Sequence, residues 1–176
     1  WRTKFGEVSF EEAWRRARGL PRSSYGTTLG HFGIGLMMVG IVATTAYQTE
    51  RVLVMKPGVT VSAGGYEATF KGGETRKGPN YMEDVADFGV TRNGHPVTML
   101  QPSKRTYDMP PMPTTEAGIL PSWRGDFYLV IGDAQTGGGY AVRAYFNPLV
   151  RFIWIGAVIM FLGGAISLSD RRLRVG

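Results

Sequence analysis

An uncharged run of residues from Ser23 to Thr49 constrains this chain more than any other feature of the sequence. Arg22 and Glu50 close the run, and His31 is the one side chain inside it that titrates near neutral pH. The apolar part, residues 25–47, is long enough at about 1.5 Å per residue to cross a hydrocarbon core of about 30 Å. The run therefore predicts a membrane-spanning helix that contains a histidine.

A second uncharged run, Phe152 to Ser169, lies between Arg151 and Asp170. Its length is close to the lower limit for a membrane-spanning helix. Both runs are rich in Gly, Ile, Val, Met and aromatic residues, as spanning helices usually are. The mean hydropathy of -0.09 averages these runs with a polar middle, so it does not indicate a soluble protein.

The net charge of +6 is concentrated at the two ends of the chain, whereas the long middle is nearly balanced. Positive charge favours the cytoplasmic side of a membrane, so we expect both termini in the cytoplasm and the middle outside. We interpret the basic ends as topology signals and expect no nucleic-acid partner, because no basic surface interleaved with aromatic residues accompanies them.

The chain has no cysteine, which excludes a disulfide, a thiol redox centre and a Cys-ligated metal within these residues. It begins with Trp1, and no signal peptide is recognisable. We therefore expect the chain to be part of a longer protein.

Between the two runs, apolar and polar residues alternate with a period of two, which is typical of β-strands. Asn93-Gly94 predicts a tight hairpin turn, since both residues tolerate positive φ. Four prolines between Met109 and Pro121 predict an extended connector there instead of a strand. The predicted strands are 51–55, 66–70, 88–92, 96–100, 127–132 and 140–146.

These patterns predict a membrane protein in which two transmembrane α-helices flank an extracytoplasmic antiparallel β-sandwich or barrel-like domain. Pro148 suits the first turn of the second helix. The expected division is a cytoplasmic amphipathic segment at 1–22, a helix at 23–49, the β-domain at 50–147, a second helix at 148–169 and a cytoplasmic tail at 170–176.

His31 is the candidate functional residue, because an imidazole in lipid is costly unless it is paired or bound. On a helix it shares a face with Gly35 and, a turn further along, Met38. Gly30 and Gly33 flank it, and small residues would let a flat group such as a porphyrin approach the backbone. Alternatively, the glycines only pack helices together, and His31 forms a hydrogen bond across that interface. Spacing alone leaves both interpretations open.

Two other groups are weaker candidates. His95 follows the predicted hairpin turn, and we interpret it as a solvated turn residue. Glu83, Asp84 and Asp87 form an acidic cluster, but their spacing does not match an EF-hand, so we expect a solvated loop. No zinc-protease motif is present.

Several segments together resemble one family, the CcmF/NrfE cytochrome c haem lyase subunits, and the resemblance covers essentially the whole chain. Leu29-Gly30-His31-Phe32-Gly33 matches the family's Leu-x-His-x-Gly motif, with glycine at position 30 where other members often have alanine. The other matching segments are Pro-Arg-Ser at 21–23, Tyr-Gly at 25–26, and residues 78–81, 104–107, 112–119, 124–128, 147–156, 163–164 and 170–172.

The resemblance implies the C-terminal part of a multi-pass protein of the bacterial inner membrane, with a periplasmic middle domain. Members carry a haem b with two histidine ligands, thought to keep the incoming haem iron reduced while haem is attached to apocytochrome c. Carried over, His31 is one axial ligand of that metal, and Gly30, Gly33, Gly35 and Met38 are expected to surround the haem. The implied partners are the rest of the CcmF-type subunit, the haem chaperone CcmE, CcmH/CcmI-type subunits, apocytochrome c, quinol and the lipid bilayer.

The family's tryptophan-rich segment is absent from this chain, as are the other haem b ligand and a periplasmic histidine pair. The resemblance therefore implies that this part alone offers one ligand of two and is not active by itself. Two alternatives remain: a non-enzymatic membrane-anchored β-domain that scaffolds a haem-handling or transport complex, and part of a transporter or sensor.

Overall fold

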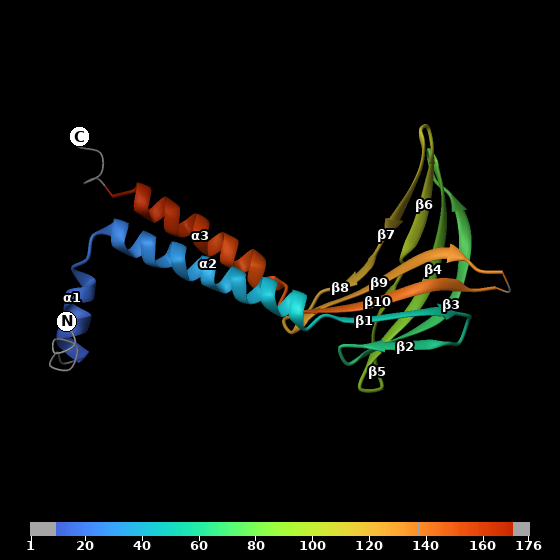
Figure 1. Ribbon diagram of the computed structural model, residues 1–176, viewed down its shortest axis with the longest axis horizontal. Helices are drawn as coiled ribbons and strands as arrows, with labels where there is room; N and C mark the ends of the chain where they lie inside the picture. Colours follow the sequence, from blue (N-terminus) through green and yellow to red (C-terminus); the bar gives the residue numbers. More distant parts are fainter. Residues whose placement is uncertain (1–9, 137, 171–176) are drawn as a thin grey trace. The chain divides into compact units, whose positions relative to one another are not determined.

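The computed structural model describes residues 10–136 and 138–170, which divide into two compact units. One unit is helical and contains α1 (Phe10–Arg18), most of α2 (Arg22–Ala46) and α3 (Arg151–Leu168). The other unit, Gly40–Arg151, contains strands β1 to β10 (Figure 1). Residues 1–9 and 171–176, which belong to the predicted amphipathic segment and tail, lie outside the described residues.

Helices α2 and α3 occupy most of the two uncharged runs. With 25 and 18 residues they are about 37 Å and about 27 Å long, and both are apolar enough to cross a membrane. Pro148 does not begin the second helix as predicted. It is the last residue of β10, and α3 begins at Arg151, after a turn in which Leu149 has a φ of 54°.

The strands form two antiparallel sheets, so the domain is a sandwich and not a barrel. The first sheet has the order β1-β10-β9-β8 and the second β2-β3-β4-β6-β7, with β5 paired to β4. The twelve-residue strand β4 pairs with β6 over its first half and with β5 over its second. The first sheet consists of β1 (Thr49–Met55), β8 (Gly118–Leu120), β9 (Gly125–Ala134) and β10 (Tyr140–Pro148). The second consists of β2 (Thr60–Ala63), β3 (Tyr66–Lys77), β4 (Tyr81–Arg92), β5 (His95–Leu100), β6 (Ser103–Asp108) and β7 (Pro111–Glu116).

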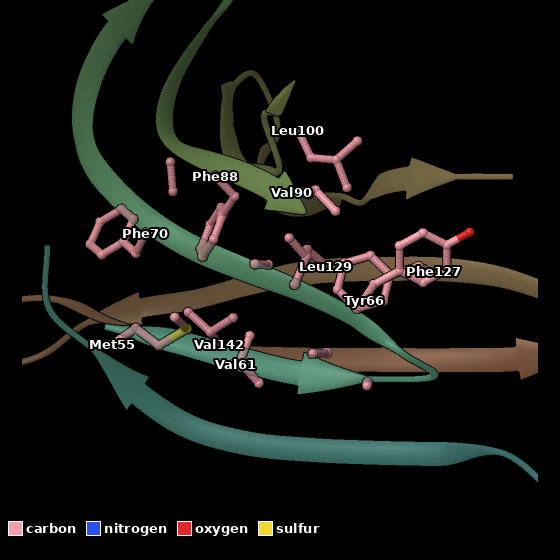
Figure 2. Packing of buried hydrophobic residues seen from close by; sticks show 14 of the residues in the cluster. Met55, Val61, Tyr66, Phe70, Phe88, Val90, Leu100, Phe127, Leu129 and Val142 are labelled. Carbon is pink, nitrogen blue, oxygen red and sulfur yellow. The ribbon is translucent and has the colours of Figure 1, made fainter. Parts of the chain in front are cut away.

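One apolar core lies between the two sheets (Figure 2). Alternate residues of each strand point into it, as the period of two predicts. Phe70 and Phe88 stack with ring centroids 5.2 Å apart, and Tyr66 stacks on Phe127 of the opposite sheet at 5.5 Å. The core therefore joins the sheets through aromatic contacts, without any cysteine.

All six predicted strand segments lie within observed strands, and the predicted hairpin is confirmed. Asn93 and Gly94 have φ values of 51° and 77° and connect β4 to β5. Positive φ at both central residues is the requirement of a type I′ turn. His95 is exposed beside this turn.

The predicted connector between Met109 and Pro121 is wrong, because β7 and β8 lie in it. Strand β7 lies at the edge of its sheet. Proline has no N–H group to donate to a neighbouring strand, so it is tolerated on an edge strand. Pro111 and Pro113 are paired in register with Asp108 and Thr106 of β6.

The acidic cluster is also not a loop, since its three residues lie in β4. Glu83 forms an ion pair with Arg105 at 2.9 Å, and this hydrogen bond raises the pKa of the guanidinium. Asp84 accepts a hydrogen bond from Thr75, and Asp87 accepts one from Gln101. These carboxylates therefore stabilise strand pairing.

Candidate functional site

Helices α2 and α3 pack against each other through glycines spaced seven residues apart. Gly26 and Gly33 are buried on α2, and Gly156 and Gly163 are buried on α3. We call these four residues the glycine interface. A Cβ atom on Gly33 would lie 2.6 Å from the carbonyl oxygen of Gly156, and one on Gly163 would lie 2.7 Å from that of Gly26. The helix backbones therefore touch, as small residues allow in membrane helices.

Asp170 fixes the end of this helix pair. Its carboxylate follows α3, is 6% exposed, and accepts a hydrogen bond of 3.0 Å from the backbone N–H of Ser23 in the first turn of α2. The first N–H groups of a helix have no partner within the helix, so an acidic oxygen there stabilises it. The contact sets the register of α3 along α2.

We expect Asp170→Ala to destabilise the helix pair by about 0.5–2 kcal/mol, the usual cost of a lost helix cap. Thermal unfolding in detergent, followed by circular dichroism at a helical wavelength, measures this loss. Ser169→Ala is the matched control, because the neighbouring Ser169 is exposed and its hydroxyl donates a hydrogen bond to the carbonyl of Ile166 in its own helix. Equal melting temperatures for the two variants would contradict the cap.

His31 lies on α2 outside the glycine interface and is exposed. Its Nδ1 atom lies 2.8 Å from the backbone carbonyl oxygen of Thr27, one turn earlier. A carbonyl oxygen only accepts, so Nδ1 carries the proton and donates it. In the neutral ring the lone pair is then on Nε2. This is the arrangement of most metal-binding histidines, whose second nitrogen donates to a carbonyl or a carboxylate.

A shallow groove of about 280 Å³ adjoins His31 on the helix pair. A Cβ atom on either Gly30 or Gly164 would have no neighbour within 4 Å, so the groove is open along two glycines. Its walls are mainly apolar. Its polar groups besides His31 are the hydroxyls of Thr27, near the start of α2, and Ser167, near the end of α3. The lining residues are Gly26, Thr27, Gly30, His31, Ile34, Met160, Gly163, Gly164 and Ser167.

The residues expected around His31 divide into different environments. Gly30 and Gly35 both have open space where a side chain would lie, whereas Gly33 is buried against α3. Met38 is exposed and does not line the groove. Met160 and Gly164 do line it, and sequence reasoning missed both because they lie on the other helix. The adjacent glycines Gly163 and Gly164 were the sequence signal that α3 could approach α2 closely.

His31 is the only histidine of this helix pair among the described residues, and no group of three or more His, Asp or Glu side chains in the described part of the chain is placed to hold a metal ion. The described residues of the helix pair therefore offer one imidazole nitrogen.

Comparison with known proteins identifies the family. A family model described as the CcmF C-terminal beta-sandwich matches residues 46–148, which include β1 to β10. The chain belongs to the CcmF family.

Curated CcmF relatives align with the helices as well as with the sandwich. A cytochrome c-type biogenesis protein, CycK of Rhizobium meliloti, is 49% identical over 99% of this chain. The cytochrome c-type biogenesis protein CcmF of Escherichia coli is 39% identical over 93%. Each alignment covers 26% of the relative, so the chain spans about a quarter of the length of these proteins.

A solved CcmF structure has the same fold. The chain described as Cytochrome c Heme Lyase CcmF superposes with a TM-score of 0.63 at 21% identity, over 94% of this chain and 26% of that one. The sandwich and the two apolar helices therefore occur together in a protein of this family.

Proposed function

We propose that this chain is the C-terminal part of a haem lyase subunit that helps to attach haem covalently to apocytochrome c. In this proposal His31 supplies one axial ligand to a membrane haem b. The observation that supports it most directly is the hydrogen bond from Nδ1 of His31 to the Thr27 carbonyl, which leaves Nε2 free on an open apolar face. The names of the CcmF relatives place them in cytochrome c biogenesis.

The residues around His31 fit a flat apolar ring with one nitrogen ligand. Gly30 and Gly164 leave the backbone accessible beside the imidazole, because nothing lies within 4 Å of their Cβ positions. Ile34 and Met160 supply apolar contact along the groove. The second axial ligand would come from a part of the protein outside this chain.

Haem b, when bound, supplies one-electron chemistry whose potential depends on the axial ligands and on burial. Around it, the described residues would bind the group and orient its ligand. His31 holds the ligand nitrogen, and the Thr27 carbonyl holds the ring in one tautomer and orientation. Close packing at Gly33 fixes the helix two residues away, so the imidazole is positioned on a rigid backbone.

We propose in addition that α2 and α3 span the bacterial inner membrane in a multi-pass protein with cytoplasmic termini. The sandwich is then periplasmic and acts as a lid or docking surface for partners that deliver haem or present apocytochrome c. Those partners are the haem chaperone CcmE and CcmH/CcmI-type subunits, and quinol supplies the electrons. The length and apolarity of both helices support the membrane location.

The test compares His31→Ala with His95→Ala in the polypeptide that contains this chain, purified from membranes. We expect His31→Ala to lose the b-type absorption bands and to assemble less cytochrome c. His95→Ala should keep both, because His95 lies in the sandwich beside an exposed turn. Unchanged haem stoichiometry in His31→Ala would refute the ligand role and favour a scaffolding function.

A further inference from the structure

Within the unit Gly40–Arg151, one end of the sandwich is hydrogen-bonded to the last turn of α2 and to the turn that leads into α3. Thr44 in the last turn of α2 donates a hydrogen bond of 3.1 Å to the carbonyl of Pro148. The N–H of Leu149, just before α3, donates one of 3.1 Å to the carbonyl of Arg124 in the loop between β8 and β9. These residues all belong to the same compact unit, so the β8–β9 loop lies next to the chain segment that leads into α3.

This end presents aromatic and basic side chains to the outside. Trp123 in the β8–β9 loop is 71% exposed, and Tyr47, directly after α2, is 73% exposed. The guanidinium of Arg151, the first residue of α3, lies 5.1 Å from the centre of the Trp123 ring. Arg124 is exposed beside it.

Aromatic and basic side chains together favour the layer of a membrane where lipid headgroups meet the hydrocarbon. Tryptophan and tyrosine rings have an apolar body and a polar tip, so they are enriched where lipid headgroups meet the hydrocarbon. Guanidinium groups form bidentate hydrogen bonds with phosphate. Arg151 is the last charged residue before the uncharged run Phe152–Ser169, so the expected hydrocarbon boundary lies close to it.

We propose that Tyr47, Trp123 and Arg124 form a juxtamembrane anchor that inserts into the phospholipid headgroup layer and holds the sandwich against the membrane. This anchor rests on the proposed membrane-spanning role of α2 and α3. Its partner is the phospholipid of the bilayer and not another protein segment. The sandwich is therefore attached to the membrane by its own loop as well as by the two chain connections.

Photocrosslinking in native inner-membrane vesicles tests the anchor. The photoreactive amino acid p-benzoylphenylalanine replaces Trp123 or Tyr47 in the polypeptide that contains this chain, and adducts are identified by mass spectrometry after irradiation. The control position is Met109, which is 94% exposed in the turn between β6 and β7, a different loop of the sandwich. We expect a several-fold excess of phospholipid adducts at positions 47 and 123 over position 109.

Crosslinks from position 123 to protein alone would overturn the anchor. Alkaline carbonate extraction separates this failure from failure of the membrane proposal. Protein that stays in the membrane but gives no lipid adduct at position 123 refutes the anchor only. Protein released by carbonate refutes both proposals.

Discussion

Adding imidazole to a His31→Gly variant is expected to restore the b-type absorption that the substitution removes. His31 is exposed on α2, and its removal leaves space beside two glycines that have no neighbour within 4 Å, Gly30 and Gly164. A free imidazole that occupies this space supplies the same ligand nitrogen without a covalent link to the helix. Visible spectra of the protein purified from membranes, recorded during an imidazole titration, measure the recovery.

Pyrrole and 1-methylimidazole are the controls. Pyrrole has the same ring size but no basic nitrogen, so it should not restore the spectrum. In 1-methylimidazole one nitrogen is blocked, so it keeps the ligand atom but cannot donate to the Thr27 carbonyl, which accepts from Nδ1 of His31 at 2.8 Å. We expect 1-methylimidazole to be weaker than imidazole. Equal recovery with pyrrole would indicate that His31 only fills space.

The two apolar helices could be predicted because the signal depends on local composition alone. Uncharged runs bounded by Arg22 and Glu50, and by Arg151 and Asp170, are visible in the sequence without knowledge of any partner. The exact residues at which the helices begin and end were harder to predict from the sequence. Pro148 has a φ that suits both a first helical turn and the end of a strand, and in the structure it ends β10 and pairs with Gly125 of β9.

The strands that were missed depend on their position in the sheet. Proline argues against a central strand but is tolerated at an edge, and only the sheet order shows that β7 is an edge strand. Likewise, Glu83 and its neighbours resemble a solvated loop until β6 places Arg105 opposite Glu83. Local patterns identify strands, whereas pairing partners come from distant parts of the chain.

The environment of each glycine near His31 could not be read from α2 alone. Gly30, Gly33 and Gly35 are the same residue type on the same helix, and contact with α3 determines which of them is buried. The seven-residue spacing of Gly26, Gly33 and Gly40, repeated by Gly156 and Gly163, was the signal that distinguishes Gly33 from the other two. A spacing of seven keeps residues on one face of a helix.

Substitutions at Gly33 and Gly35 are expected to change the stability of the helix pair in opposite directions. A methyl group on Gly33 would lie 2.6 Å from the carbonyl oxygen of Gly156, a backbone atom that can move only if the helices separate. We expect Gly33→Ala to cost about 1–3 kcal/mol, as overpacking does. Gly35→Ala meets nothing within 4 Å and should stabilise the helix by about 0.5–1 kcal/mol through the lower conformational freedom of alanine.

Thermal unfolding of the chain in detergent, followed by circular dichroism, shows whether each substitution raises or lowers the stability of the helix pair. The haem content of the whole polypeptide shows whether the substitution also affects haem binding at His31. Gly33→Ala should lower the haem content, because the separation of the helices displaces His31 and opens the groove walls formed by α3 residues such as Met160. Gly30→Ala should preserve helix pairing, since no atom lies within 4 Å of its Cβ position. A Gly33→Ala protein as stable as Gly35→Ala would show that backbone contact at the glycine interface does not hold the helices together. The rigid positioning of the imidazole would then need another cause.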